Sequence, residues 1–373
     1  MIYIVLSICL LYVALILFYR KAWNTIIQVK EINHKDKVSV VVACRNEEKN
    51  IKNLIKDVMN QHFDKDKFQM IIVDDHSEDN TLEFLHIESK KWNNLHVFSM
   101  NNHKGKKNAI RKGVRFSTGD VILCTDADCR MQENWIKTML SNFTKDHIKF
   151  VSGPVQYFCE DNLLNKFQSL ELFSLVSSGA AAIQLRKSTI CNGANLAFRR
   201  QEYNEIPLDI FDNFTTDDIS LLHYFKNHYK DGICFSKDVD SVVETNSNSD
   251  ILSQLNQKLR WISNTKHVRD VDSFYVALVV FLMNFVFVIL LLLSLVSIFY
   301  SHEERYIVAA SFLFVLFVKS LTDYLFLRNV LDFFQRKDLL IYIFPFEIIN
   351  AIYTVLIVPL SLFYFPKWKG RRL

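Results

Sequence analysis

Hydrophobic segments at both ends of the chain limit its fold more than any other feature of the sequence. Residues 2–18 are apolar, and residues 274–365 consist mostly of Leu, Ile, Val and Phe. Residues 30–270 between them are charged and have the composition of a soluble α/β domain. A chain of 373 residues therefore has room for one soluble domain and a few membrane helices.

Basic residues follow the N-terminal apolar segment. Arg20 and Lys21 come directly after it, whereas a cleaved signal peptide carries its positive charge before the apolar run. We expect residues 1–20 to form an uncleaved membrane anchor that leaves the following domain in the cytosol. Because the run is near the lower length limit for a span, a buried core helix is the alternative.

The hydrophobic C-terminal region divides into three apolar segments. Residues 274–300 are long enough to cross a membrane, and residues 306–327 are long enough to return. A simple crossing by residues 339–365 would leave the basic C-terminal residues outside, against the usual bias of basic residues to the cytosol. Pro345 and Pro359 can instead break this segment into a re-entrant or interfacial path, and we favour a cytosolic C-terminus.

Two ionisable residues, Lys319 and Asp323, lie within the second apolar segment. They are four residues apart and so share one face of a helix. Ionisable groups at such depth are costly and usually face protein or a water-filled path. A structural ion pair and a role along a substrate path both fit this pattern.

Charge and cysteine content narrow the functional class. The 44 Lys and Arg residues against 40 Asp and Glu give a net charge of +4, which is a weak basis for binding nucleic acid. The 7 cysteines include no CxxC pair and are expected to be reduced thiols or core residues, so no zinc site is predicted.

The soluble region alternates apolar strands with amphipathic helices. The predicted strands are residues 38–44, 70–74, 96–99 and 121–125, and the predicted helices include residues 47–61 and 106–116. This order predicts an α/β domain over residues 37–265, with a Rossmann-like, mostly parallel sheet between helices. No GxGxxG follows the first strand and no GxxxxGK[ST] occurs. Their absence argues against dinucleotide-dependent oxidoreductases and P-loop nucleoside triphosphatases.

Polar residues follow the predicted strands at the edge where parallel sheets bind ligands. Arg45 and Glu47 follow the first strand, and Asp74 and Asp75 follow the second. Asp75 lies closer to the next loop and is the better candidate ligand, although the two aspartates can also be solvated groups at a helix N-terminus. Ser77 is a candidate to cap the helix that follows.

A basic loop, residues 103–108, opens the helix predicted over residues 106–116. Amide groups at a helix N-terminus, together with ammonium groups, suit a diphosphate. The alternative is a basic loop that is simply solvated.

Asp126 and Asp128 come directly after the fourth strand, separated by one small residue. Two carboxylates so placed can share one hard divalent cation that also bridges a diphosphate. A lone Asp-x-Asp triplet is more often a surface turn, but its position at the end of a strand favours a metal site.

Gln257, Arg260 and Trp261 share one side of a predicted helix before the first C-terminal apolar segment. Arg260 can offer its planar guanidinium to a phosphate, and Trp261 can give a sugar ring a stacking surface. A tryptophan and an arginine at this point can also be interfacial membrane anchors.

Together, the strings Thr125–Asp128, Thr216–Asp218 and Gln257–Trp261 resemble the motifs of membrane-bound, inverting family 2 glycosyltransferases. This family includes cellulose, chitin and hyaluronan synthases and ceramide glucosyltransferase. The resemblance covers about residues 37–265 and implies a GT-A fold, the nucleotide-sugar-binding fold of the family.

The resemblance also implies how a donor would bind. Mg²⁺ or Mn²⁺ is expected on Asp126 and Asp128, and a nucleotide sugar, in particular a UDP-sugar, is expected near Asp75 and Lys106. Arg45 and Glu47, at the end of the first strand, are included in the predicted donor site.

A catalytic role for Asp218 is likewise implied by the resemblance. Asp218 takes the position of the family's catalytic base, although Asp217 stands where the family has glutamate. In the alternative, these two aspartates simply cap the helix predicted over residues 219–225. Gln257, Arg260 and Trp261 match the family's QxxRW string at every defined position and are included in the predicted catalytic site.

The acceptor remains open between a growing polysaccharide and a lipid or lipid-linked glycan. The QxxRW string favours a polymer synthase, whereas the family's polymer synthases usually have more membrane helices than the three or four expected here. In either case we expect a multi-pass protein of the bacterial inner membrane with its catalytic domain in the cytosol. A non-catalytic nucleotide-sugar sensor or transport accessory protein is the alternative outside the enzymes.

Overall fold

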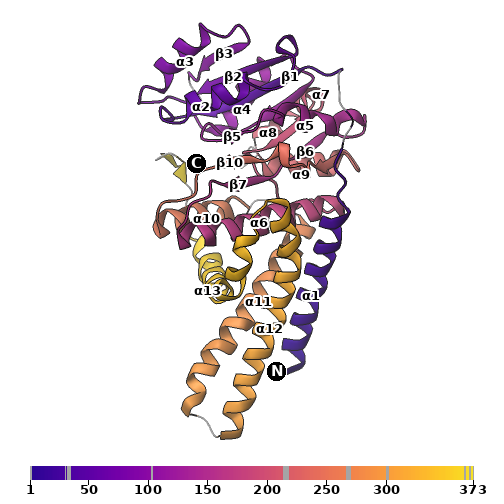
Figure 1. Ribbon diagram of the computed structural model, residues 1–373, viewed down its shortest axis with the longest axis vertical. Coiled ribbons are helices and arrows are strands. Elements are labelled where there is room, and N and C mark those ends of the chain that lie inside the picture. The colour runs from indigo at the N-terminus through magenta and orange to yellow at the C-terminus, as the bar shows by residue number, and fades with distance from the viewer. Residues whose placement is uncertain are drawn as a thin grey trace. The chain divides into compact units, whose positions relative to one another are not determined.

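The computed structural model describes residues 2–29, 31, 35–101, 104–212, 218–265, 270–299, 302–364, 367–368 and 371–372. The chain divides into two compact units. Unit 1 comprises Met1–Thr25, Glu160–Ala181 and Asn248–Pro366, and unit 2 comprises Ile26–Cys159, Ala182–Ser247 and Lys367–Leu373. Figure 1 shows the chain with its elements labelled where there is room.

Unit 2 is built on a central sheet that has seven strands in the described part of the chain, in the order β3-β2-β1-β4-β8-β6-β9. These strands are β1 (Val38–Cys44), β2 (Phe68–Asp74), β3 (Leu95–Ser99), β4 (Val121–Cys124), β6 (Phe150–Ser152), β8 (Leu196–Arg199) and β9 (Ile233–Phe235). β1 pairs in parallel with β2 and β4, and β2 pairs in parallel with β3. Only β8 runs against its neighbours β4 and β6. The predicted α/β fold with a mostly parallel sheet is confirmed.

Short helices and a small second sheet complete unit 2. The helices are α2 (Ile51–Met59), α3 (Thr81–Ser89), α4 (Lys106–Arg115), α5 (Trp135–Ser141), α7 (Arg200–Asn204), α8 (Leu208–Asp212) and α9 (Ile219–His228), with 3-10 turns η1 (Lys65–Lys67), η2 (Asn142–Thr144) and η3 (Val239–Ser241). The second sheet has the order β5-β10-β7, formed by β5 (Arg130–Met131), β7 (Val155–Tyr157) and β10 (Val243–Thr245). Two further short strands, β11 (Lys367–Trp368) and β12 (Arg371–Arg372), pair with each other.

The apolar strands of unit 2 are buried because helices cover the sheet. Every residue of β1 is buried, as expected for a strand covered on both faces. α4 packs directly on β1 and β2. Gly113 makes this contact possible, since a methyl group at Gly113 would lie 2.4 Å from Cγ1 of Val41.

The expected helix cap at Ser77 is wrong. α3 begins at Thr81, and the residue before it is Asn80. The hydroxyl of Ser77 instead accepts a hydrogen bond from the backbone N–H of Asn46, 3.0 Å away. The loop after β2 is therefore fastened to the loop after β1, which delays the start of the helix.

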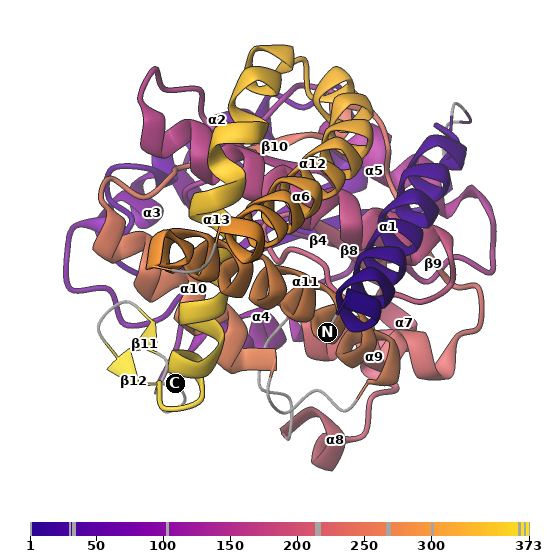
Figure 2. The same ribbon diagram turned by 90° about the horizontal axis from the view of Figure 1, so that it is seen from below.

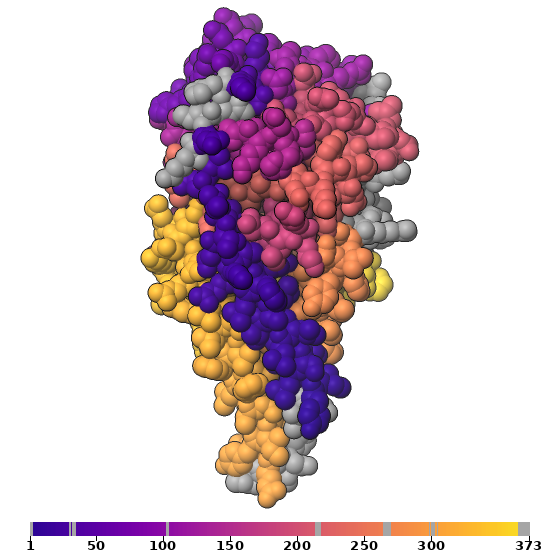
Figure 3. All heavy atoms as spheres, turned by 90° about the vertical axis from the view of Figure 1, so that its right-hand side faces the viewer, coloured from indigo at the N-terminus to yellow at the C-terminus, as the bar shows by residue number. Residues whose placement is uncertain are grey.

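Unit 1 consists of long helices. They are α1 (Ile2–Thr25), most of α6 (Leu163–Gln184), α10 (Ile251–Thr265), α11 (Val271–Val296), α12 (His302–Phe333) and α13 (Ile343–Ser361), with 3-10 turns η4 (Ser297–Phe299) and η5 (Lys337–Tyr342). α1 packs on α11 and α12, and α11 packs on α13 (Figure 2). Figure 3 shows the side chains of α1 along the outside of this unit, where Leu10 and Phe18 are exposed.

Four helical stretches in the described residues are long and apolar enough to cross a membrane: Tyr3–Thr25, Val271–Val296, Arg305–Phe333 and Lys337–Ser361. The last of these is not broken in the way that Pro345 and Pro359 suggested. α13 runs without interruption from Ile343 to Ser361, with Pro359 inside it.

A polar cluster joins three of these helices. The ammonium of Lys319 on α12 lies 2.9 Å from Oδ2 of Asp323 and also forms an ion pair with Glu347 on α13. The hydroxyl of Tyr12 on α1 donates a hydrogen bond of 2.6 Å to Oδ1 of Asp323. The predicted pair of Lys319 and Asp323 is therefore part of a larger network that connects α1, α12 and α13.

Candidate active site

The register of the central sheet brings the carboxyl ends of neighbouring strands to one edge. Cys44, at the end of β1, pairs with Asp74 at the end of β2, and Asp74 pairs with Ser99 at the end of β3. On the other side, Val41 pairs with Cys124 at the end of β4. Residues that follow these four strands therefore share one edge of the sheet, as expected for a ligand site in an α/β fold.

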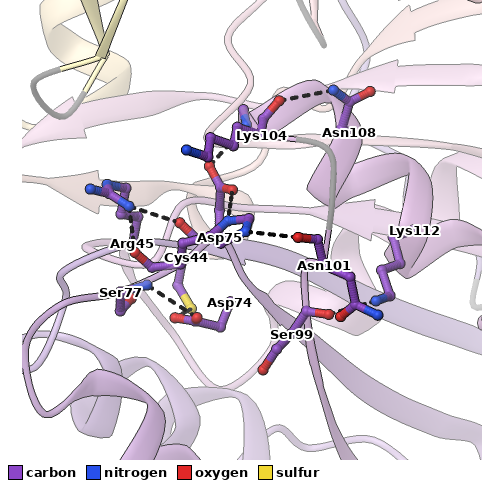
Figure 4. Close-up of polar contacts among 12 residues, drawn as sticks. Cys44, Arg45, Asp74, Asp75, Ser77, Ser99, Asn101, Lys104, Asn108 and Lys112 are labelled. Atoms are coloured by element: carbon purple, nitrogen blue, oxygen red, sulfur yellow. Dashed lines mark hydrogen bonds and ion pairs between the residues drawn. The ribbon is translucent and has the colours of Figure 1, made fainter.

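Asp75 connects the end of β2 to the start of α4 (Figure 4). Its Oδ2 accepts a hydrogen bond of 2.9 Å from the backbone N–H of Gly105, and its Oδ1 lies 3.0 Å from Nδ1 of His76. Asp74 accepts a hydrogen bond of 3.1 Å from the backbone N–H of Ser77. Because Asp74 and Asp75 are both fully buried, the alternative of solvated carboxylates at a helix N-terminus is wrong.

Arg45 and Glu47 shape the loops around this edge. The Arg45 guanidinium donates to the carbonyl of Asp75, 3.1 Å away, and to that of His76, and it forms an ion pair of 2.9 Å with Glu78. The backbone N–H of Glu47 donates to the hydroxyl of Thr81 over 2.8 Å, and both Arg45 and Glu47 are buried. Their observed contacts hold the loops after β1 and β2 together.

Lys106 reaches the carboxylate that follows β4. α4 begins at Lys106 after Gly105, whose φ of 101° lies in the left-handed region that favours glycine. The Lys106 ammonium lies 2.7 Å from Oδ1 of Asp126, and both side chains are partly exposed. Asp126 thus already binds a cationic group from the same chain.

Asp126 and Asp128 have the chemistry that a hard divalent cation requires. Both are partly exposed, whereas Ala127 and Cys129 beside them are buried. The Thr245 hydroxyl donates a long hydrogen bond of 3.4 Å to Oδ2 of Asp128. Their carboxylate oxygens are the ligand type that Mg²⁺ and Mn²⁺ prefer, so the residues fit such an ion.

A metal ion here would also need oxygen ligands from outside the protein. In the residues that the structure describes, no three His, Cys, Asp or Glu side chains are grouped to hold an ion. Burial, reinforced by the carboxylates of Asp126 and Asp128, raises the pKa of the Cys129 thiol well above its usual range, which makes a thiolate ligand unfavourable. All seven cysteines are free, in agreement with the expectation of reduced thiols.

Asp218 lies at the N-terminus of α9 and close to Lys106. Its Oδ1 accepts from the backbone N–H of Ile219 over 2.7 Å, and its Oδ2 accepts from that of Gly193 over 3.1 Å. A methyl group added at Gly193 would lie 3.0 Å from the Lys106 ammonium and 3.2 Å from Oδ2 of Asp218. Asp218 therefore does cap the helix, and it also belongs to a compact group with Lys106, Asp126 and Gly193. Thr216 and Asp217 lie outside the described residues.

Gly193 and Asn195 belong to the small, polar segment of residues 192–195 before β8, which resembles the family's acceptor-side segment. Asn195 is fully buried, donates to the carbonyls of Pro154 and Ser241, and accepts from the indole of Trp135. The small polar residues before β8 were the available signal. Gly193 leaves space beside Lys106 and Asp218, and Asn195 connects three segments by its hydrogen bonds.

Gln257, Arg260 and Trp261 lie on α10, which belongs to unit 1. Gln257 accepts a hydrogen bond of 2.9 Å from the side-chain amide of Asn248. The Lys258 ammonium lies 4.5 Å from the centre of the Trp261 ring. The Arg260 side chain is partly exposed.

A comparison with known protein families matches the part of the chain that contains β1 to β4 and the residues after them. Residues 39–206 match the profile of glycosyl transferase family 2. The match identifies a glycosyl transferase family 2 domain over these residues. The matched residues include Asp75, Lys106, Asp126 and Asp128, whereas Asp218 and α10 lie beyond them.

Two curated relatives match part of this chain. A poly-β-1,6-N-acetyl-D-glucosamine synthase of Staphylococcus aureus (strain COL) is 27% identical over 146 residues, which are 39% of this chain and 35% of that protein. Glycosyltransferase AglE of Haloferax volcanii is 28% identical over 120 residues, 32% of this chain and 40% of that protein. The chain thus matches less than half the length of either relative.

One solved structure is similar over nearly the whole chain. The mannosyltransferase PcManGT from Pyrobaculum calidifontis, solved with GDP-Man and Mn²⁺, aligns with a TM-score of 0.58. The alignment covers 95% of this chain and 99% of that one at 14% sequence identity. It supports the GT-A-like fold.

Proposed function

We propose that this family 2 glycosyltransferase moves a sugar from a nucleotide sugar to an acceptor hydroxyl, with inversion at the anomeric carbon. The observation that carries the proposal is the group formed by Lys106, Asp126 and Asp218 around Gly193. An ammonium, a metal-type carboxylate and a second carboxylate are the three kinds of group that such a transfer requires. We assign this chemistry to a catalytic domain over residues 37–265.

Donor binding is assigned to the strand ends. Asp126 and Asp128 would hold Mg²⁺ or Mn²⁺, which when bound neutralises charge on the departing diphosphate. Lys106, which pairs with Asp126 in the structure, would turn to the diphosphate once the metal takes its place. We infer a UDP-sugar with the nucleoside near Asp75, and the name of the Staphylococcus aureus relative makes UDP-N-acetylglucosamine the first donor to test.

Asp218 is the proposed general base. Two backbone N–H groups fix its carboxylate, which would accept the proton of the acceptor hydroxyl. The hydroxyl oxygen attacks the anomeric carbon while the bond to the diphosphate breaks on the opposite side. A single displacement of this kind converts an α-linked donor into a β-linked product. Arg260 would add positive charge at the phosphates, and Gln257 and Trp261 would contact the acceptor side.

The acceptor is assigned to the cytosolic face of a bacterial inner membrane, in a multi-pass topology. Four helices of membrane-spanning type in the described chain support this placement. The name of the Staphylococcus aureus relative favours a growing polysaccharide, and the small number of helices favours one transfer to a lipid or lipid-linked glycan.

The test is transfer by the purified protein in lipid nanodiscs. UDP-N-acetylglucosamine is supplied with Mn²⁺ and with either a β-1,6-linked N-acetylglucosamine oligomer or extracted membrane lipids, and UDP release and product masses are measured. A ladder of masses indicates a polymerase, and a single addition indicates one transfer. Binding of UDP with no turnover of any UDP-sugar, in the wild type and in Asp218→Asn alike, would instead support a non-catalytic sensor.

A further inference from the structure

The residue after Gln257 has a specific environment in unit 1. Lys258 is buried, and its ammonium lies 2.8 Å from Oε1 of Glu171 on α6. The same ammonium lies over the Trp261 ring, 4.5 Å from its centre. Glu171 therefore holds the cation that contacts the indole.

A second chain of contacts leads from α6 to Gln257. Gln168 on α6 accepts from the backbone N–H of Asn248 over 2.8 Å and donates to the Asn248 carbonyl over 2.9 Å. The side-chain amide of Asn248 then donates to Oε1 of Gln257 over 2.9 Å. Gln168 thus fixes the backbone of the residue that orients Gln257.

Gln254 connects the two chains of contacts. Its side-chain amide donates to Oε2 of Glu171 over 2.8 Å, and its oxygen accepts from Asn248 over 3.0 Å. Gln168 and Gln254 are almost completely buried. A buried polar network whose members are hydrogen-bonded favours one arrangement of its side chains over alternatives.

We propose that α6 positions the acceptor-side residues of α10, with Lys258 and Glu171 as positioning residues for Trp261 and with Gln168 and Asn248 as positioning residues for Gln257. This proposal deepens the function proposed above and rests on it. It assigns a role to Lys258, a position that the QxxRW string leaves undefined.

The energetics favour positioning over simple helix packing. Removing a lysine from water is costly, and a buried ion pair is often no more stabilising than apolar side chains of similar size. Burial lowers the pKa of Lys258, while the Glu171 carboxylate opposes this by favouring the ammonium. An aliphatic residue would pack α10 on α6 at lower cost, but it would not hold a cation against the indole.

The first experiment observes Trp261 directly and needs no activity. The protein has five tryptophans, so ¹⁹F NMR of protein labelled with 5-fluorotryptophan gives a small set of signals, and Trp261→Phe identifies the signal of residue 261. Lys258→Met should shift and broaden that signal and leave the other four unchanged, whereas Lys258→Arg should keep it near its position. Glu171→Gln should reproduce the effect of Lys258→Met in weaker form.

Lys166 provides a matched control within the same unit. It also forms an ion pair, 2.6 Å from Asp161, and its ammonium also lies over an aromatic ring, 5.1 Å from the centre of Tyr342. Lys166→Met removes a contact of the same kind that does not involve residues 257–261, and it should leave the Trp261 signal unchanged. An unchanged Trp261 signal in Lys258→Met, or an equal shift in Lys166→Met, overturns the proposal.

The second experiment separates positioning from stability through kinetics. The substrates are UDP-N-acetylglucosamine and the β-1,6-linked oligomer. Lys258→Met should raise KM for the oligomer roughly 3- to 30-fold, which is the factor expected from the loss of a cation–π contact shielded from water. KM for the donor should stay within a factor of about 2. In a Trp261→Leu background the same change should have little further effect, and an undiminished effect there would contradict action through the indole.

The two proposals fail in distinguishable ways. If the wild type transfers no sugar, the proposed function fails, while the ¹⁹F signals still decide whether Lys258 positions Trp261. If Lys258→Met lowers the melting temperature and kcat but leaves the oligomer KM and the Trp261 signal unchanged, Lys258 has only a structural role and the positioning proposal is wrong.

Discussion

Asp126 and Lys106 form the contact most directly linked to donor chemistry. The ammonium of Lys106 lies 2.7 Å from Asp126, where a divalent cation is proposed to bind. In the proposed mechanism the lysine would exchange one partner for another, the Asp126 carboxylate before the donor binds and the diphosphate afterwards.

Loss of one metal-type carboxylate should weaken cation binding. We expect Asp128→Asn to lower the affinity for Mn²⁺ in the presence of UDP by at least roughly 10-fold. Residues that only hydrogen-bond to a metal ligand already contribute at least about 10-fold to metal affinity, and a direct ligand should contribute no less. Mn²⁺ binding is followed by electron paramagnetic resonance, and the exposed Asp146→Asn serves as the control. Full transfer activity in excess chelator would exclude the metal assignment.

Asp218 combines a proposed catalytic role with a structural one. Asp218→Asn should lower transfer by ~10²–10⁴-fold, the usual contribution of a general base, with little change in donor affinity. Because the amide nitrogen cannot accept from Gly193 or Ile219, the variant should also lose about 1 kcal/mol of stability. Asp64→Asn changes a cap elsewhere in unit 2 and should leave transfer intact.

Asp217 decides whether the base has been assigned to the correct neighbour. We expect Asp217→Asn to be much milder than Asp218→Asn in the transfer assay. If Asp217→Asn abolishes transfer and Asp218→Asn does not, the two roles are exchanged. If neither matters, the base lies elsewhere.

Gly193 and Gly105 are glycines for different physical reasons. Gly193→Ala places a methyl group about 3 Å from both Lys106 and Asp218, so transfer should fall roughly 10- to 100-fold through misplacement of reacting groups. Gly105→Ala meets no atom within 4 Å but requires a φ of 101°, so it should lower stability by about 1 kcal/mol. Transfer rates and urea unfolding distinguish the two variants. A normal transfer rate for Gly193→Ala would show that the site accommodates the added methyl group without displacing Lys106 or Asp218.

At the scale of elements, the sequence pattern predicted β1, β2, β3 and β4 but did not predict β6 and β9. The prediction for residues 38–44 agrees with β1 residue by residue, because a run in which six of seven residues are apolar has few alternatives. β6 and β9 have only three residues each, too few for any periodicity to appear. The antiparallel direction of β8 depends on pairing with β4 and β6, which no local pattern encodes.

Candidate site residues were predictable where they directly follow a strand, and not where their role depends on contacts distant in sequence. Asp75, Asp126 and Asp128 follow strands, so topology alone places them at one edge of the sheet. The specific role of Gly193 was not predictable, because it comes from long-range contacts with Lys106 and Asp218. Ser77 was assigned to the wrong partner because its bond to Asn46 connects two loops that are distant in sequence.

The packing of α4 on β1 can be tested as a contact between elements. Gly113→Ala places a methyl group 2.4 Å from Cγ1 of Val41 and should destabilise unit 2 by roughly 1–3 kcal/mol through overpacking. Val41→Ala removes the opposing carbon, so the double variant should be more stable than the sum of the single effects predicts. Urea unfolding of the four proteins measures the coupling, and strict additivity would contradict direct contact.

At the scale of the whole molecule, the proposed topology places unit 2 in the cytosol. Cys159 is exposed, whereas the other cysteines are buried or partly buried. An impermeant maleimide should therefore label Cys159 only after cells are permeabilised. Glu303→Cys, at the exposed start of α12, should be labelled in intact cells because α11 precedes it as a crossing. The opposite pattern would reverse the topology.

The polar cluster between α1, α12 and α13 has a consequence for how the protein is made. Tyr12 and Asp323 are 311 residues apart in the chain, and Glu347 is synthesised later still. Until α13 emerges from the ribosome, Lys319 has Asp323 as a carboxylate partner but lacks Glu347, and ionisable groups in a membrane are costly unless their polar contacts are complete. We expect the early helices to wait near the insertion machinery, so that a chain truncated before Glu347 is recognised as unfinished and degraded.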